Sequence, residues 1–503
     1  MRALPFIVMA ATGLVACNGG SDSDAPATGT DLQPSSTSAT NSDASSAAAV
    51  ANAVRETVAA FEREAPAGTA GALTIRPSSA RDPGPRAGND SAGLPLRNLT
   101  PQQLAAFNAG KTDFEEAEEI EEGLGPTMNL DSCGGCHSQP ATGGTSPAVN
   151  PQVAFAIQHG MTNRVPPFIR ANGPVREARF VRNPDGSPDG GVHALFTIAG
   201  TEAPGCTLAQ PDFVRQMANR NVVFRIPTPV FGAGLIEAIP DSEIFRNQGA
   251  QADAKRSLGI RGRPNVLLNA NAISGQVNRN GNDGTAGRFG WKAQNKSLLI
   301  FSGEAYNVEM GITNGMFPTE RGDESEACNP APLPNSDSTL DGVAPGVLSS
   351  IDLFTLFMRF LAPPVPSATV PGGSESITRG RGLFASTGCA LCHTPSMKTY
   401  NASVAAMRYQ IANLFSDLLL HDMGRGLADG IQQGQAGGRE FRTAPLWGLG
   451  QRLFFLHDGR TSDLRQAIRE HASDGSEANS VVQRFYNLGD AQQQDLLNFL
   501  RSL

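Results

Sequence analysis

The sequence predicts a soluble globular protein of two or three domains, built from short secondary-structure elements that are joined by long loops. The chain has 503 residues, and a single hydrophobic core rarely grows beyond about 250–300 residues. Its 55 glycines and 35 prolines indicate many turns and loops. Apolar residues make up 40% of the chain, and no run approaches the ~20 apolar residues of a membrane-spanning helix. We therefore expect no transmembrane segment.

The charge of the chain argues against binding to nucleic acid. The formal net charge is −8, and no block of lysines and arginines stands out. Proteins that bind phosphate backbones depend on such basic contacts and on the release of counterions. We therefore expect no nucleic-acid partner.

The N-terminus has the form of an export signal. Met1 and Arg2 precede an apolar stretch over residues 3–16 that is too short to span a bilayer, and Cys17 follows. Residues 14–17, Leu-Val-Ala-Cys, resemble a bacterial lipobox, after which cleavage would leave a lipidated cysteine. We expect a lipoprotein signal peptide over residues 1–17, with the lipid on Cys17 as the membrane anchor. By resemblance to Gram-negative lipoproteins, an aspartate after the cysteine would retain the protein at the inner membrane. Asn18 stands there instead and favours the periplasmic face of the outer membrane. The alternative is a plain signal peptide with an incidental cysteine.

Composition divides the exported chain into three parts. Residues 18–98 are mostly small, polar or Pro/Gly-rich, with little apolar surface to offset the entropy of ordering, so we interpret them as a low-complexity tether. Thr100-Pro101 is typical of a helix start. The proline- and glycine-rich stretch LAPPVPSATVPGG (361–373) cannot continue a helix. We expect an N-terminal domain over 99–365 and a C-terminal domain over 375–503.

Two copies of Cys-x-x-Cys-His, the attachment signature of c-type haem, are the most specific feature of the sequence. The residues are Cys133, Cys136 and His137 in the first copy and Cys389, Cys392 and His393 in the second. Two cysteines three apart can reach both vinyl groups of one porphyrin as thioethers, and the adjacent histidine then meets the iron. The sequence predicts two covalently bound haem c groups, with His137 and His393 as axial ligands. Alternatives are a zinc site and a redox-active disulfide.

Two cysteines remain once the anchor and the haems are assigned. In an oxidising compartment Cys206 and Cys328 are expected to pair, so the sequence predicts a disulfide between them. The alternative is two unrelated buried thiols.

The ligand on the far side of each iron decides the chemistry, because a second strong ligand favours electron transfer and an open position favours catalysis. His159 and Met161 follow the first motif, and His421 and Met423 follow the second. His193, His457 and His471 are the other histidines outside the two motifs. Taken alone, each of these histidines is equally consistent with a structural or propionate-binding role.

Several segments together resemble the bacterial di-haem oxidoreductase family that is also labelled thiol oxidoreductase. They are GLGPTMNLDSC (123–133), PVFGAGLIEAIP (229–240), GRFGWKA (287–293), MGIT (310–313), SDLLLHDMG (416–424), RTAPLWG (442–448) and LHDGR (456–460). The resemblance spans residues 99–503 and extends distantly to di-haem cytochrome c peroxidases. It implies a mainly α fold of two cytochrome c-like haem domains, the first enlarged by a loop-rich insertion with some β between about residues 166 and 329. Nothing in the sequence supports thiol chemistry.

By position, the resemblance places the catalytic iron on His137 and the electron-transfer iron on His393. Glu237 would be a carboxylate that moves protons at the catalytic site. The alternative is a structural glutamate. Trp291 or Trp447 would relay electrons between the haems. The alternative is that both tryptophans only pack in the core. The acidic run FEEAEEIEE (114–122) would dock a basic donor cytochrome. The alternative is a solvated helix face.

Three functions are therefore open at this point. The first is a periplasmic peroxidase-like enzyme that reduces peroxide or another small oxidant with electrons from a cytochrome or a small donor. The second is a pure electron carrier in which both irons are six-coordinate. The third is a di-haem oxygenase, by resemblance to rubber oxygenases with two such motifs.

Overall fold

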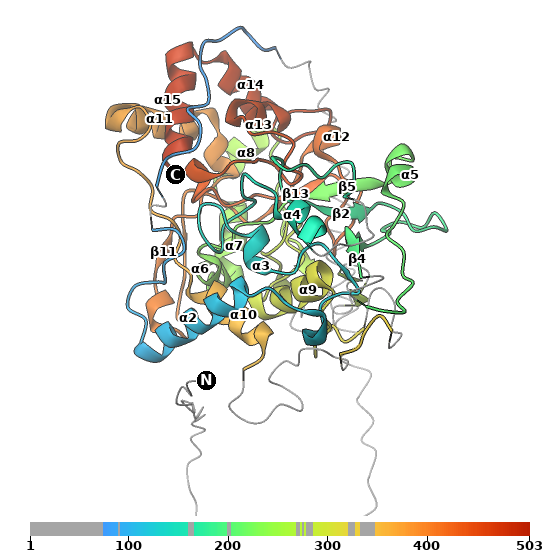
Figure 1. The fold of residues 1–503 in the computed structure, drawn as a ribbon. Helices are drawn as coiled ribbons and strands as arrows, with labels where there is room; N and C mark the ends of the chain where they lie inside the picture. Colours follow the sequence, from blue (N-terminus) through green and yellow to red (C-terminus); the bar gives the residue numbers. More distant parts are fainter. Residues whose placement is uncertain are drawn as a thin grey trace, which may run out of the picture. The chain divides into compact units, whose positions relative to one another are not determined.

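Helices form most of the regular structure, with small antiparallel sheets between them (Figure 1). The computed structural model describes residues 74–88, 91–158, 165–198, 203–267, 272–273, 276–277, 285–319, 327–331 and 348–503. All of these lie within one compact unit, Ala70–Leu503. Cys17, His159 and Met161 fall outside the described residues. In the described part, no helix is long and apolar enough to cross a bilayer.

The described α-helices are distributed along the compact unit from residue 101 to residue 502. They are α2 (Pro101–Glu115), α3 (Cys133–Cys136), α4 (Pro151–Gln158), α5 (Phe213–Ala218), α6 (Ala233–Glu237), α7 (Asp241–Gly249), α8 (Ala252–Leu258), α9 (Leu298–Met310), α10 (Ser350–Phe360), α11 (Gly373–Thr387), α12 (Gly424–Leu427), α13 (Leu464–Glu470), α14 (Asn479–Asn487) and α15 (Asp490–Ser502). Four 3₁₀ turns are described as well: η1 (Ile120–Glu122), η2 (Cys389–Leu391), η3 (Ala405–Met407) and η4 (Leu449–Gln451).

The strands are short, and the described pairings are antiparallel. They are β1 (Thr127–Met128), β2 (Glu177–Phe180), β3 (Val192–His193), β4 (Phe196–Thr197), β5 (Val222–Arg225), β6 (Val266–Leu267), β7 (Ala272–Ile273), β8 (Gln276–Val277), β9 (Thr285–Ala286), β10 (Met397–Lys398), β11 (Ile411–Ala412), β12 (Leu420–Asp422) and β13 (Glu440–Arg442). One sheet has three strands in the order β3-β2-β5, and the other described sheets have two. Eight of the thirteen described strands, β2 to β9, lie in the region where the family resemblance implies an insertion with some β.

The first helix pair joins segments far apart in the chain. Thr100 caps α2 in a capping box with Gln103, and Pro101 is the first helical residue, which confirms the predicted helix start. Helix α2 lies against α10 (Figure 1). The rings of Phe107 and Phe357 are 5.4 Å apart at this contact. A Cβ at Gly110 would overlap the carbonyl oxygen of Leu353, so glycine permits the close crossing.

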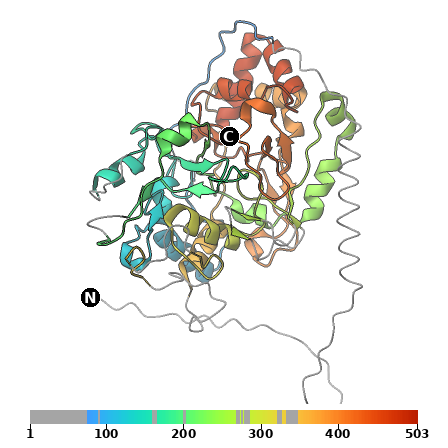
Figure 2. The ribbon, with the colours of Figure 1, turned by 90° about the vertical axis from the view of Figure 1, so that its right-hand side faces the viewer.

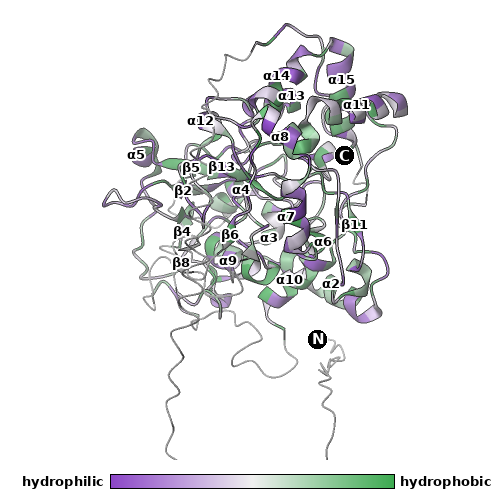
Figure 3. Ribbon diagram, turned by 180° about the vertical axis from the view of Figure 1, so that it is seen from behind, coloured by the Kyte–Doolittle hydropathy of each residue, from purple (hydrophilic) through white to green (hydrophobic). Residues whose placement is uncertain are grey.

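A second helix pair repeats this arrangement near the C-terminus. Helix α11 lies against α15, and the rings of Phe384 and Phe499 are 5.4 Å apart. A Cβ at Gly380 would overlap the carbonyl oxygen of Asp495. Figure 3 shows polar and apolar colours mixed along α11, α14 and α15, as expected of helices with one buried face. Each Cys-x-x-Cys-His motif therefore follows a helix that crosses a later helix at a glycine.

Two hydrophobic cores correspond to these two helix pairs. The larger core includes Phe107, Phe114 and Phe357, and the smaller one includes Phe384 and Phe499. Met397, Met407 and Leu414 come from the C-terminal part of the chain but pack in the larger core. Figure 2 shows the green helices α7 and α8 beside the orange and red C-terminal part. Residues of the C-terminal part thus contribute to the hydrophobic core of the N-terminal part.

The segment 74–98, which the sequence analysis places in the tether, is packed on the globular body where it is described. The main-chain N–H of Ser79 donates to Asp490 of α15, and that of Arg81 donates to Gln494. Farther along, the N–H of Leu96 donates to the carbonyl of Phe360 in α10. Composition could not indicate this packing, because it depends on partners about 400 residues away along the chain.

The strongest contact of this segment is the ion pair of Asp82 with Arg501. Arg501 Nε and Nη2 donate to the two carboxylate oxygens at 2.7 and 2.6 Å. The side chains are 6% and 1% exposed. Burial raises the pKa of Asp82, but the hydrogen bonds and charge of Arg501 outweigh burial and hold it below its ordinary value.

We predict that Asp82→Ala lowers the free energy of unfolding by about 3–5 kcal/mol, because it leaves a buried guanidinium unpaired. Guanidinium-chloride denaturation followed by circular dichroism measures the change. Because the folded-state pKa is depressed, the wild-type contribution is present above pH ~4 and is lost as the pH falls through that lower pKa. Asp253→Ala is the control, because its pair with Arg256 is exposed. Equal stability of the Asp82 variant and the control would contradict the prediction.

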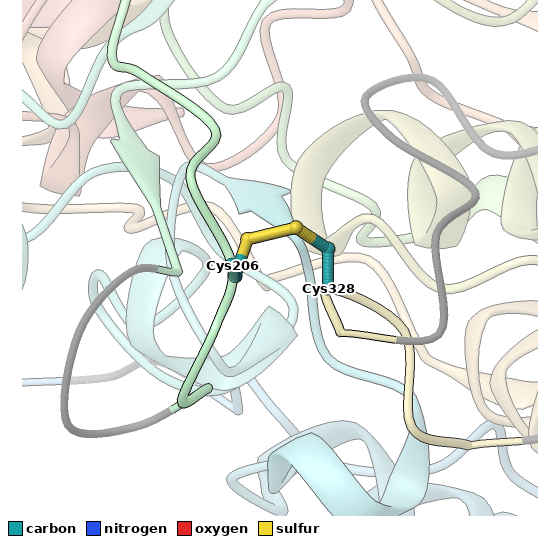
Figure 4. The surroundings of a disulfide bond; sticks show 2 residues. All are labelled: Cys206 and Cys328. Atoms are coloured by element: carbon teal, nitrogen blue, oxygen red, sulfur yellow. A yellow bond between two sulfur atoms is a disulfide. The ribbon is translucent and has the colours of Figure 1, made fainter.

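Cys206 and Cys328 form a disulfide, the pair that the sequence predicts (Figure 4). Cys206 lies between β4 and α5, and Cys328 lies beyond α9, so the bond joins two loops. The two cysteines are 122 residues apart in the sequence. The bond therefore closes a long loop of the N-terminal part.

Replacing both cysteines with serine should lower the free energy of unfolding by about 2–5 kcal/mol, because closing a long loop restricts the unfolded chain. Thermal unfolding of the double variant and of the wild type, each with and without reductant, measures this difference. Reductant should lower the stability of the wild type only. An unchanged unfolding temperature in the double variant would contradict the expectation.

Candidate functional sites

The first motif forms one wall of a cavity, cavity 1, that encloses about 1170 Å³ including space open to solvent. Helix α3 is the motif itself, and Cys133, Cys136 and His137 all line the cavity. Its two glycines permit tight packing, since a Cβ at Gly135 would press on the side chain of Leu130.

The second motif lines a separate cavity, cavity 2, of about 1400 Å³ including space open to solvent. Cys389, Cys392 and His393 lie on its wall. Because the two motifs line different cavities, their four cysteines do not converge on one tetrahedral site. The geometry favours two independent sites.

The two motif histidines are held in the same way. Nδ1 of His137 donates to the carbonyl of Gly144 at 3.0 Å, and Nδ1 of His393 donates to the carbonyl of Phe415 at 3.0 Å. Burial lowers the pKa of each imidazole to about 4, so both rings are neutral at pH 7. A carbonyl oxygen only accepts, so Nδ1 carries the proton and Nε2 keeps its lone pair. This is the orientation of a metal-ligating histidine.

The motif cysteines do not resemble reactive thiols. Burial raises the pKa of Cys389 to about 11 and raises the pKa values of Cys133 and Cys136 well above their ordinary range. A redox-active cysteine instead needs a depressed pKa and partial exposure. The environment of these cysteines therefore argues against a redox-active thiol pair.

Buried arginines in cavity 1 provide a test of fit for a haem, whose propionates are anionic. Arg179 pairs with Asp189, and Arg225 pairs with Asp429, yet Nε of each guanidinium has no hydrogen-bond partner. Both side chains line the cavity. Unpaired buried N–H groups are costly, so a ligand that accepts their hydrogen bonds would remove the penalty. The residues fit a haem carboxylate.

Cavity 2 has a comparable pair, Arg442 and Arg452. Both are buried, and burial lowers the pKa of each to about 10. Arg442 donates to the carbonyl of Gly290 at 2.8 Å. Their side chains meet no carboxylate among the described residues. A buried guanidinium without an anion is unfavourable, so these residues also fit a haem propionate.

The described histidines outside the two motifs divide into three kinds. His421 has both ring nitrogens on carboxylates, at 2.9 Å from Asp417 and 2.8 Å from Glu477. These carboxylates and Cys392 outweigh burial and raise the pKa of His421, so it is an imidazolium without a lone pair for iron. His193 stacks on Phe180 and lines neither cavity.

His471 and His457 line cavity 2 with free ring positions. Nδ1 of His471 donates to the carbonyl of Ala467 at 2.7 Å, which leaves Nε2 with its lone pair, as in His137 and His393. His457 stacks on Phe441 at 4.3 Å, and its ring also meets Trp291 edge-on. Met423 lines the same cavity.

Glu237 does not have the surroundings of a proton-transfer group. Its carboxylate binds Arg359 at 2.7 Å and accepts from the N–H of Leu298 at 2.9 Å, at the start of α9. It does not line cavity 1. Glu237 thus holds the first N–H of α9, whose N-cap is Ser297, and its predicted catalytic role stays a prediction.

Sequence reasoning missed the carboxylates that do line cavity 1 from α9. Glu304 is buried and accepts a hydrogen bond from Asn295, and Glu309 accepts from Nδ2 of Asn129 at 2.6 Å. The MGIT segment begins one residue after Glu309, which was the available indication. Met310 also lines the cavity, with its sulfur 3.8 Å from the Cys133 sulfur.

The two tryptophans have different positions. Trp291 lines cavity 1, cavity 2 and a smaller cavity of about 520 Å³ that shares residues with both. Its indole N–H donates to the carbonyl of Ile226 at 3.0 Å. Trp447 is 5% exposed and lines only the smaller cavity, where it packs against Gly232. Trp291 is therefore the tryptophan placed between the two sites.

The acidic run 114–122 is not one solvated face. Phe114 is buried and meets the His137 ring edge-on at 5.9 Å. Glu115 binds Lys111, and Glu118 turns toward Tyr306. Only part of the run is free to face a partner.

Comparison with known proteins adds one clear match. A family model described as "di-haem oxidoreductase, putative peroxidase" matches residues 214–503, and the first motif precedes this range. No curated protein matches. A hydrazine synthase structure from Kuenenia stuttgartiensis matches with a TM-score of 0.21 and 18% identity, over 31% of this chain. This chain spans about half of that structure's length (55%). A TM-score this low supports no conclusion about fold.

The family match begins before α6 and runs through both tryptophans, the second motif and the last helix. It covers more than half of the 503 residues. The chain therefore belongs to the di-haem oxidoreductase family.

Proposed function

We propose that this protein is a peroxidase-like di-haem c-type cytochrome, with a catalytic site in cavity 1 and an electron-transfer site in cavity 2. The observation that carries the proposal is an asymmetry between the cavities. Among the described residues, His137 is the only histidine that lines cavity 1, whereas His393, His421, His457 and His471 line cavity 2. One iron would keep an open position and the other would be six-coordinate.

Each haem would be held by its motif as a c-type group. The cysteines would form the thioethers, and His137 and His393 would supply Nε2 to the iron. The repeated helix crossings at Gly110 and Gly380 support two cytochrome c-like halves. Arg179 and Arg225 in cavity 1, and Arg442 and Arg452 in cavity 2, would donate hydrogen bonds to the propionates.

His471 is the residue that we assign to the second position on the iron of cavity 2. Its Nδ1 bond to Ala467 fixes the ring as in the two proximal histidines. His421 cannot compete, because both of its nitrogens bind carboxylates. In cavity 1 the Met310 sulfur lies 3.8 Å from the Cys133 sulfur, so it would meet a haem held by Cys133 near that thioether.

Reduction of hydrogen peroxide to two waters takes up two electrons and two protons. Haem iron supplies the redox chemistry when bound. The chain must pass two protons from solvent to the peroxide, and the carboxylates of Glu304 and Glu309 line the cavity where these protons are needed. Trp291 lines both haem cavities, which supports a role in electron transfer between them.

The proposed location rests on the lipobox-like residues 14–17, and the proposed partners rest on the family resemblance. We propose that the protein is exported, carries lipid on Cys17, faces the periplasm from the outer membrane, and takes electrons from a cytochrome or a small donor. Cys17→Ser should move the protein from the membrane fraction to the soluble periplasmic fraction. Retention of the variant in the membrane would argue against lipid anchoring.

Electron paramagnetic resonance of the ferric protein tests the proposed function. One high-spin and one low-spin signal are expected, and hydrogen peroxide should remove the high-spin signal. Peroxide consumption with a reduced donor is measured on the same sample. Two low-spin signals that peroxide does not change, in both the oxidised and the half-reduced protein, would identify an electron carrier instead.

A further inference from the structure

Tyr306 is a buried titratable group that none of the roles above uses. It belongs to α9, is 3% exposed and lines cavity 1. Its hydroxyl donates to Oε1 of Glu118 at 2.6 Å. Glu118 is partly exposed and lies between α2 and η1. The pair thus connects the interior of cavity 1 with the protein surface.

We infer that Tyr306 and Glu118 form a proton-entry route from solvent to cavity 1. The inference rests on the proposed function and adds the supply of its protons. Each turnover requires two electrons from the donor and two protons from solvent for every peroxide that becomes two waters. A proton taken up by Glu118 would pass to the Tyr306 hydroxyl oxygen, while the hydroxyl, turned toward cavity 1, would give its own proton to an oxygen of the peroxide that is reduced to water.

The surroundings of the pair suit this role. The carboxylates of Asp113, Glu116 and Glu122 lie near Glu118, and burial together with their charges raises the pKa of Glu118 to about 7. Glu118 therefore exchanges protons near neutral pH. Burial and Glu118 raise the pKa of Tyr306, so its hydroxyl stays protonated between transfers.

A second link reaches the same tyrosine. The side chain of Ser350, at the start of α10, lies near both Asp113 and Tyr306 and lowers the pKa of each. Burial and Glu116 raise the pKa of Asp113 to about 6. Asp113 is thus a second carboxyl group in the neighbourhood of the Tyr306–Glu118 pair.

A purely structural role for Tyr306 would rest on its edge-on contact with Phe354, at 5.0 Å between ring centroids. Tyr306→Phe preserves this contact and removes only the hydroxyl. Glu118→Gln preserves the size of the side chain and removes its titration. The matched controls are Tyr486→Phe, whose hydroxyl donates to the carbonyl of Arg465, and Glu121→Gln, which is exposed.

The experiment measures peroxide reduction from pH 5 to 9, the solvent deuterium isotope effect, and the pH dependence of the midpoint potential of the high-spin haem. Tyr306→Phe and Glu118→Gln should each slow peroxide reduction about tenfold or more, change the isotope effect and flatten the potential between pH 6 and 8. The controls should behave as wild type.

The outcomes separate this inference from the proposed function. A wild type that does not reduce peroxide overturns the proposed function, and the potential measurement then still decides the proton route. If both variants keep the wild-type rate, isotope effect and pH dependence of the potential, the proton route is overturned.

Discussion

Replacing His471 with alanine should convert the second haem from low spin to high spin and slow peroxide reduction by more than about 100-fold. Loss of groups that merely orient a metal ligand costs about 10–100-fold, so loss of the ligand itself should cost more. The haem should stay attached, because the thioethers of Cys389 and Cys392 do not depend on His471. Electron paramagnetic resonance and stopped-flow kinetics with a reduced donor measure the two effects.

Two further variants make this prediction specific. His471→Met replaces one strong ligand with another, so it should remain low spin and raise the midpoint potential of the second haem. His193→Ala is the control, because His193 lines neither cavity. If His471→Ala keeps the wild-type low-spin signal, His471 is not the ligand, and His457→Ala becomes the next variant to measure.

Replacing the carboxylates of α9 with amides should slow peroxide reduction without changing haem ligation. We expect a loss of about 10²–10⁴-fold when Glu309 or Glu304 becomes glutamine, the usual contribution of a general acid or base. Both side chains line cavity 1, and an amide cannot pass on a proton. Single-turnover kinetics with peroxide measures the loss, and unchanged spectra of the ferric variants show that both haems are intact.

Glu237→Gln is the matched control for these two variants. Glu237 accepts a hydrogen bond from the first N–H of α9, the helix that carries Glu304 and Glu309, but it lies outside cavity 1. The variant should keep wild-type turnover and lose some stability through its contact with Arg359. If Glu237→Gln is slow while Glu304→Gln and Glu309→Gln are fast, the assignment from the cavity is wrong and the sequence-based interpretation is restored.

The stability predictions for Asp82 and for the disulfide concern scaffolding that the catalytic variants leave untouched. Asp82 and Arg501 join the segment before α2 to the last helix. The disulfide joins two loops of the N-terminal part. Turnover of the folded variants should therefore remain close to wild type at temperatures below their unfolding transitions.

The sequence by itself determined what depends on neighbouring residues. The two Cys-x-x-Cys-His motifs, the helix start at Thr100-Pro101 and the pairing of the two leftover cysteines were all available from short patterns or from counting. The family resemblance, carried by several short segments, agreed with the match to residues 214–503. The structure confirms the helix start and the disulfide, and the family match confirms the resemblance, whereas haem attachment at the two motifs stays a prediction. Short patterns and residue counts were enough for these inferences.

Only the tertiary structure decided which polar side chains share a cavity. Glu237 and Glu309 are both glutamates near family-like segments, yet one caps a helix and the other lines cavity 1. His421 and His471 were equivalent candidates until the structure placed Asp417 and Glu477 on both nitrogens of His421. The packing of residues 74–98 likewise depends on the distant helix α15. Burial, lone-pair direction and ion pairing arise from contacts between distant segments, which no short sequence pattern contains.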